Sequence, residues 1–350
     1  MAIRLQDIAD DLNLSKMTIS KVLRGQTDVS AETKARVLKR MKELNYRPNI
    51  SARGLRTGQT YSVGMVVPTL ADRAVAEMVR GINEVFRPAG YSLVVSSVDG
   101  DAEVEEREAE LHLSRQVDAL IVCPSANASE VPQILETTSV PVIYAGTPPA
   151  RVAGVNGASR GVLSVALRET EVGEIATRFL LECRCRRIAY LRGPRTAVGD
   201  QRFAGFLEAL RGAGVVVRQE WVAETQPGIS DYRGGVAVMK RLLGGKTRPD
   251  GVVAYTDLLA AGARDAAQTE GVEVPRALQV IGSGNVAEIC ETQVPLTSVD
   301  LVAEEIGRRV ARVALKRIAE KDAVHRSVLL SPRVVIREST RTQRTGRHVN

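Results

Sequence analysis

Long apolar runs are missing from this sequence. No stretch of about 18 apolar residues occurs, and Met1 is not followed by a basic segment and then an apolar one. We therefore expect neither a membrane span nor a secretory signal, and we expect the protein to remain in the cytoplasm.

Cysteine and histidine are scarce, with four and three residues. Cys183 and Cys185 form the only pair close in sequence, and they lack the second pair or the histidines that a zinc site needs. The cysteines are expected to be reduced, mostly buried thiols, and no metal is expected. His112 is expected on an ordinary helix surface.

Recognised catalytic patterns are also missing. There is no G-x-S-x-G or Walker sequence, and no histidine lies near a Cys or Ser pattern that suggests a nucleophile. Residues 282–287 match G-x-G-x-x-A, which leaves a nicotinamide enzyme as a weak alternative. That fingerprint also needs a sustained helix, and Pro295 follows too soon. We expect no enzyme, no catalytic residue and no cofactor.

The chain has 350 residues, of which 44% are hydrophobic and 25% charged. This length and composition predict a folded protein of two or three domains. The charge is uneven, because residues 1–60 carry 12 Lys/Arg against 6 Asp/Glu while residues 61–350 carry 36 against 35. The excess indicates a polyanion-binding N-terminal module on an electrically balanced body.

The first 46 residues predict three short helices. Apolar residues recur at helical spacing from Ile3 to Leu12, and Ser15 is a good N-cap for a helix over Lys16–Leu23. Ser30 opens a longer helix in which Val37, Leu38, Met41 and Leu44 are expected to share a face.

From Tyr61 onward, apolar strand runs alternate with amphipathic helices. Strands are expected near 61–67, 91–97, 118–123, 140–145, 187–192, 215–222, 251–255 and 278–283. Helices are expected near 75–88, 103–116, 129–138, 171–183, 201–213, 230–243, 257–270 and 300–319. The alternation predicts an α/β core of two doubly wound parallel-sheet subdomains, with ligands in the crevice between them.

A helix, a three-residue turn and a helix form a DNA-reading geometry when the second helix has a buried face and a basic outer face. Ile19, Val22 and Leu23 can pack inward. The outward residues expected to contact bases are Lys16, Met17, Ser20 and Lys21. Those expected to contact the DNA backbone are Thr18, Arg24, Lys34 and Asn49. The alternative is a helical-bundle oligomerisation domain.

Several motifs together resemble a known family. They are Leu5-Gln6-Asp7-Ile8-Ala9, the run from Leu14 to Leu23, Leu44-Asn45-Tyr46-Arg47-Pro48-Asn49 and Ala52-Arg53-Gly54-Leu55. This order is similar to the N-terminal signature of the lactose-repressor (LacI/GalR) family of bacterial transcription regulators. Looser similarity continues to about residue 338.

The resemblance implies a homodimeric repressor with a helix-turn-helix headpiece (1–47), a hinge helix (48–60) and a periplasmic-binding-protein-like core (61–338). It implies that Ala52 and Leu55 enter the minor groove of a palindromic operator in double-stranded DNA, where Leu55 acts as a wedge. The N-subdomain is expected at 61–163 and 297–325 and the C-subdomain at 164–296 and 326–338. A disordered basic tail is expected at 339–350.

The expected effector cleft departs from the family pattern. Carboxylates usual in the family are replaced by Gly146, Arg168 and Gly284, whereas Arg202 and Asp257 are retained. The candidate effector-binding residues are Asp72, Arg168, Arg202, Asp257 and Asn285. One hypothesis is an anionic effector such as a sugar acid or sugar phosphate; the other is a cleft that binds nothing.

Two further alternatives are a small-molecule binding protein and a sequence-blind architectural DNA-binding protein. The basic headpiece argues against the first, and a salt-matched competition between an operator and random DNA tests the second.

Overall fold

The computed structural model describes residues 3–23, 28–46, 58–124, 132–146, 163–193, 195–225, 231–320 and 326–341. The chain divides into a unit of residues 1–60 and a unit of residues 61–350.

The described residues of the N-terminal unit form three helices, α1 (Leu5–Asp11), α2 (Lys16–Leu23) and α3 (Ala31–Glu43), as the sequence predicts. Their small core consists of Ile8, Ala9, Ile19, Val22, Val37 and Met41. The Ser15 and Ser30 hydroxyls accept hydrogen bonds from Thr18 N (3.0 Å) and Thr33 N (3.2 Å), which confirms both caps. Leu38 is 48% exposed, so the expectation that it shares the buried face is wrong.

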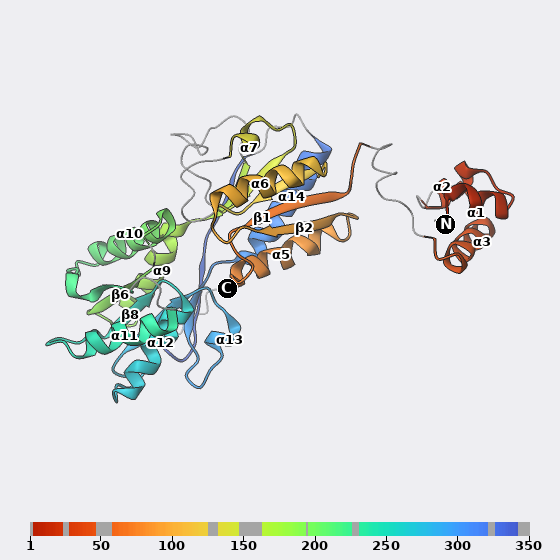
Figure 1. Ribbon diagram of the computed structural model, residues 1–350. Coiled ribbons are helices and arrows are strands. Elements are labelled where there is room, and N and C mark those ends of the chain that lie inside the picture. Colours follow the sequence, from red (N-terminus) through yellow and green to blue (C-terminus); the bar gives the residue numbers. More distant parts are fainter. Residues whose placement is uncertain are drawn as a thin grey trace. The chain divides into compact units, whose positions relative to one another are not determined.

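The second unit contains two six-stranded sheets (Figure 1). The first sheet is entirely parallel and has the order β11-β5-β4-β3-β1-β2. Its strands are β1 (Ser62–Val67), β2 (Ser92–Ser97), β3 (Ala119–Val122), β4 (Val142–Ala145), β5 (Leu163–Leu167) and β11 (Val328–Leu330).

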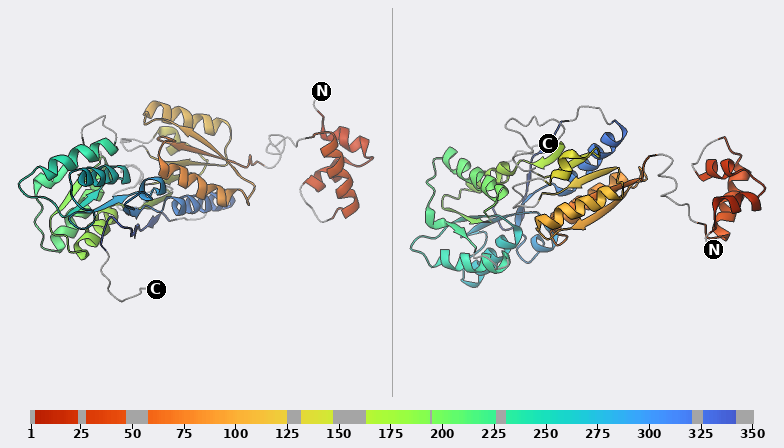
Figure 2. Two further views of the ribbon diagram at one scale, coloured as in Figure 1. Left: turned by 90° about the horizontal axis from the view of Figure 1, so that it is seen from below. Right: turned by 45° about the horizontal axis from the view of Figure 1, so that its top comes forward.

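Helices cover both faces of the first sheet. Successive side chains of a strand point to opposite faces, so a buried apolar strand needs apolar cover on both of them. Val63, Met65 and Ile121 pack toward α5 (Arg73–Phe86) and α14 (Ala303–Ala319), which lie side by side (Figure 2). Val66, Leu120 and Val122 pack toward α6 (Ala102–Ser114) and α7 (Gln133–Thr137).

The second sheet has the order β12-β10-β9-β8-β6-β7, with only β12 antiparallel to its neighbour. Its strands are β6 (Ile188–Arg192), β7 (Val222–Glu224), β8 (Gly251–Ala254), β9 (Gln279–Ser283), β10 (Thr297–Asp300) and β12 (Arg333–Val335). One face packs against α9 (Glu169–Glu182) and α10 (Ala197–Gly212), the other against α11 (Asp231–Leu243) and α12 (Asp257–Thr269) (Figure 1).

The predicted strand over 215–222 is wrong. Residues 219–221 form a 3₁₀ turn, and the strand begins at Val222. The prediction also missed β5, β10, β11 and β12, which have three to five residues each; β11 and β12 are partly exposed.

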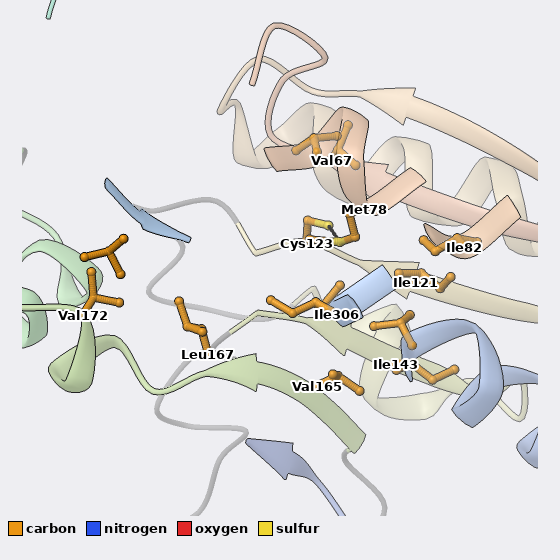
Figure 3. Packing of buried hydrophobic residues seen from close by; sticks show 14 of the residues in the cluster. Val67, Met78, Ile82, Ile121, Cys123, Ile143, Val165, Leu167, Val172 and Ile306 are labelled. Atoms are coloured by element: carbon orange, nitrogen blue, oxygen red, sulfur yellow. Dashed lines mark hydrogen bonds between the residues drawn. The ribbon is translucent and has the colours of Figure 1, made fainter. Parts of the chain in front are cut away.

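The chain crosses between the two sheets at Arg168, at residues 301–302 and at residues 331–332. This differs from the predicted subdomain boundaries: β5 and β11 belong to the first sheet, and β10 belongs to the second. The helix expected from Asp300 begins at Ala303, because Asp300 ends β10 and Val302 has a left-handed backbone (φ 48°). Leu167 and Val172, on either side of the first crossing, belong to the same buried cluster (Figure 3).

The start of the expected disordered tail is packed. Ser339 and Thr340 are buried, and Ser339 Oγ donates a hydrogen bond to the carbonyl of Val280 (2.6 Å). Residues 342–350 lie outside the described part of the chain. The prediction of disorder is therefore wrong for residues 339–341, and for residues 342–350 it lies outside the described part of the chain.

The expectation that His112 lies on a helix surface is wrong, because the residue is only 1% exposed. Its ring lies against Gly64 of β1, where a Cβ atom would come within 2.7 Å of it, and its Nε2 is 3.1 Å from Ser96 Oγ. Burial lowers the pKa of His112. All four cysteines are buried as predicted, and Cys123 contacts Met78 through sulfur (Figure 3).

Three helix pairs are in backbone-to-backbone contact through glycine. A Cβ atom at Gly205 of α10 would lie 1.9 Å from the carbonyl oxygen of Thr170, and one at Gly173 of α9 would lie 1.8 Å from that of Arg202. The pairs α5–α14 and α11–α12 use one glycine from each helix in the same way: Gly81, Gly307, Gly235 and Gly262. Side chains at these positions would force the helices apart.

We predict that Gly205→Ala lowers the free energy of unfolding by at least about 1–3 kcal/mol, because the added methyl group overlaps backbone atoms. The control is Gly212→Ala in the last turn of the same helix, where no atom lies within 4 Å of an added Cβ. This control is expected to gain about 0.5–1 kcal/mol. Urea unfolding of both variants measures the difference, and equal stabilities would contradict the role given to Gly205.

Candidate DNA-reading face and effector cleft

Helix α2 presents a mixed basic and apolar surface. Its buried residues Ile19 and Val22 anchor it on the headpiece core, which leaves Lys16 and Met17 exposed at its first turn. Met17 is 67% exposed, so its apolar side chain is available for contact with a partner. The same face therefore offers one cation and one apolar group.

Other predicted DNA contacts have partners within the headpiece. Lys21 forms an ion pair with Asp28, and Thr18 Oγ1 lies 2.9 Å from Ser15 Oγ. Ser20 is half-buried and Lys34 is exposed on α3. The expected contacts Arg24, Asn49, Ala52 and Leu55 lie outside the described residues.

Arg40 ties α3 to α1. Its Nε donates to Asp11 Oδ2 (2.5 Å), and its Nη1 donates to Glu43 (3.0 Å). The hydrogen bond from Arg40 lowers the pKa of Asp11. Arg40 therefore stabilises the packing of α3 on α1, and Asp11 and Glu43 balance its charge.

The first polar cluster of the expected cleft centres on Arg202. Its Nε donates to Glu169 Oε2 (2.7 Å), its Nη1 donates to the carbonyl of Tyr255 (3.3 Å), and its guanidinium lies 4.8 Å from the centre of the Tyr255 ring. The Arg202 and Glu169 side chains are only 9% and 12% exposed. Glu169 thus balances the positive charge of Arg202. The hypothesis of an anionic effector depends on that charge.

The second cluster centres on Asp257, at the start of α12. It is 1% exposed and accepts hydrogen bonds from Ser298 Oγ (2.5 Å) and Val286 N (2.8 Å). Burial raises the pKa of Asp257, and these two donors act in the opposite direction. A Cβ at Gly282 would lie 2.3 Å from the Asp257 carboxylate, which explains the glycine there.

Asn285 joins the Asp257 cluster. Its backbone N donates to Ser298 Oγ (2.9 Å), and its side-chain oxygen accepts from Arg337 (2.7 Å). Its backbone is left-handed (φ 55°), a conformation that asparagine tolerates better than most residues. The predicted Asp257 and Asn285 are therefore brought together by Ser298.

Asp72 and Arg168 lie at the ends of helices. Asp72 caps α5 through a hydrogen bond from Ala74 N (2.9 Å). Burial raises the pKa of Tyr255, and the negative charges of Glu169, Asp231 and Asp72 act in the same direction. Arg168 is half-exposed and pairs with Glu171 at 3.5 Å.

Sequence reasoning missed the partners in these clusters: Glu169, Tyr255, Ser298 and Arg337. Tyr255 directly follows β8, so an aromatic side chain at the carboxyl end of a predicted strand was the available signal. Ser298 lies within β10 and Arg337 follows β12; neither strand was predicted, and nothing local to the sequence indicated these two residues.

Comparisons with known proteins agree with this architecture. Residues 4–49 match the family described as bacterial regulatory proteins, lacI family, and residues 177–340 match the periplasmic binding protein-like domain. The HTH-type transcriptional repressor PurR of Mannheimia succiniciproducens is 31% identical over 339 residues, covering 96% of this chain and 98% of that protein. The chain belongs to the LacI family.

Other relatives span the whole chain. Catabolite control protein A of Staphylococcus xylosus is 28% identical and covers 97% of this chain and 100% of that protein. A lac repressor dimer, solved bound to operator and the anti-inducer ONPF, is 24% identical with a TM-score of 0.80 and covers 97% of this chain and 99% of that chain. The similarity to this structure establishes the shared fold.

This LacI-family chain is a DNA-binding transcription regulator. Its helix-turn-helix headpiece and its two-sheet second unit are the two parts that define such regulators. Within the described ranges, no helix is long and apolar enough to cross a membrane.

We predict that Glu169→Gln destabilises the protein by about 3–5 kcal/mol, because it leaves the buried Arg202 guanidinium without its counter-charge. The double variant Glu169→Gln/Arg202→Met is expected to recover part of this loss. Glu174→Gln removes an exposed ion pair with Arg178 on the same helix and serves as the control, with an expected cost of about 1 kcal/mol or less. Urea unfolding that gives equal losses for Glu169→Gln and Glu174→Gln would contradict the buried-pair argument.

Proposed function

We propose that this regulator is a cytoplasmic, non-enzymatic repressor that binds a palindromic operator as a homodimer. The observation that carries the proposal is α2, which buries Ile19 and Val22 and exposes Lys16 and Met17 at its N-terminal turn. A second helix with this division of faces enters the major groove in helix-turn-helix proteins. A homodimer presents two such helices to the two halves of a palindrome.

Base recognition then rests on α2. Lys16 donates to guanine acceptors, and Met17 makes apolar contact with a thymine methyl group. Ser20 and Lys21 extend this face, and Asp28 must release Lys21 before that lysine reaches the DNA. Thr18, Arg24, Lys34 and Asn49 hold the phosphates, and Ala52 and Leu55 enter the minor groove.

The effector site lies between the two sheets, around the Arg202 and Asp257 clusters. Asp72, Arg168, Arg202, Asp257 and Asn285 are its proposed contacts. Because Glu169 balances Arg202, an anionic sugar acid or phosphate must compete with Glu169 for the guanidinium. The cleft is therefore better matched to a ligand that contributes both a donor and an acceptor than to a bare anion.

Genome-wide mapping of bound sites tests the proposal as a whole. The expected result is one recurring palindrome, and the purified protein should prefer it over scrambled DNA in a salt-matched competition. Equal affinity for both duplexes, with and without metabolite mixtures, would show instead a sequence-blind DNA-binding protein or a small-molecule binding protein.

Lys16→Ala should change base preference at one operator position, at a cost of about 1–3 kcal/mol for the preferred base. Lys34→Ala is the control, because a lost phosphate contact weakens binding to all sequences and lowers the salt slope by about 1. Binding of both variants to an operator library measures the difference. A uniform loss for Lys16→Ala would identify Lys16 as a phosphate contact.

Leu55→Ala should weaken operator binding and remove a central bend in the DNA, because the wedge that holds the base step open is shortened. A gel-phasing assay measures the bend. Unchanged bending by the variant would rule out the wedge role of Leu55.

A further inference from the structure

A polar groove lies on the outer edge of the second sheet. It has a volume of about 440 Å³ and runs beside β7, the last strand of that sheet. Its walls contain three arginines, Arg192, Arg195 and Arg241, and its apolar surface comes from Phe203, Leu207 and Val222. Small-molecule sites commonly combine apolar walls with a few polar groups in this way.

Arg192 is the least exposed of these arginines. The residue is 8% exposed, and its guanidinium lies 4.5 Å from the centre of the Phe203 ring. Its Nε is buried and has no hydrogen-bond partner in the described part of the chain. The carboxylate oxygen Glu224 Oε1 lies 3.8 Å from Arg192 Nε, which is too far for a hydrogen bond.

The charges of the groove do not cancel. Arg192 pairs with Asp200 through a terminal nitrogen, and Arg195 donates to Glu224 (2.5 Å). Arg241 forms no ion pair with any residue that the structure describes. Three guanidinium groups therefore face two carboxylates, and one buried donor lacks an acceptor. A buried donor without an acceptor is unfavourable, so an acceptor supplied by a ligand would be bound with a gain in free energy.

The groove is separate from the proposed effector site. Arg202 and Phe203 are consecutive in α10, yet Arg202 points to Glu169 and Tyr255 whereas Phe203 contacts Arg192 and Tyr190. Arg192 and Glu224 are paired in register at the carboxyl ends of β6 and β7, and β7 is the edge strand of the sheet. A ligand in the groove thus uses a different set of side chains from one in the cleft.

We propose that this groove is a second ligand site that binds a small organic anion. The carboxylate or phosphate group of the ligand accepts hydrogen bonds from Arg192 Nε, Arg195 and Arg241, and its body lies on Phe203, Leu207 and Val222. Arginine suits this role because its planar fork binds carboxylate and phosphate groups with two parallel hydrogen bonds.

The test uses the full-length protein and two probes, citrate and inorganic phosphate, at constant ionic strength. Isothermal titration calorimetry is expected to detect saturable binding of at least one probe. Arg195→Gln and Arg241→Gln are each expected to weaken it by about tenfold, since each removes a charge-assisted hydrogen bond. Arg211→Gln, in the exposed last turn of α10 and outside the groove, is the matched control and should bind like the unmodified protein.

Three outcomes would overturn the proposal: no saturable binding of either probe, equal binding by all variants, or loss of binding in Arg202→Gln with full binding in both groove variants. The last result would assign the anion to the cleft. Operator binding, measured in parallel on the same samples, tests the headpiece independently. A failure of the groove is therefore distinguishable from a failure of the proposed function.

Discussion

Close contact between the backbones of paired helices is the constraint on which the second unit depends. In each of three pairs, one glycine per helix lets the carbonyl oxygen of the partner occupy the space of a side chain. The α9–α10 contact holds Arg202 beside Glu169, because Gly173 lies directly against the carbonyl of Arg202. The helix packing and the polar cluster of the cleft are thus parts of one arrangement.

The polar groups around Arg202 and Asp257 satisfy each other's hydrogen bonds. Asp257 takes its hydrogen bonds from Ser298 and Val286, Asn285 takes one from Arg337, and Arg202 is paired with Glu169. A buried charge with a partner is tolerated, whereas an unpaired one is costly. An effector bound at the proposed site would have to replace these contacts, so its affinity would depend on how well it reproduces the donors and acceptors it displaces.

Much of the fold was predictable because it follows from local patterns. The three headpiece helices and their serine caps were predicted from apolar spacing and hydroxyl side chains, and the parallel sheets from the alternation of strand and helix. Several short strands were not predicted from such patterns. The segment from Thr297 to Asp300 is a buried strand of four residues whose polar sequence carries no strand signal, and His112 is buried only because Gly64 makes room for its ring.

The sequence alone determined the family, the amphipathic second helix of the headpiece with Lys16 and Met17 on its outer face, and the two-sheet class of the core, since each depends on residue order or periodicity within a short segment. The tertiary structure decided which strand belongs to which sheet and which charges are already balanced. Glu169 and Arg202 are 33 residues apart, and Asn285 and Arg337 are 52 apart. Pairing over such separations is set by how the helices and strands pack, and no local pattern records it.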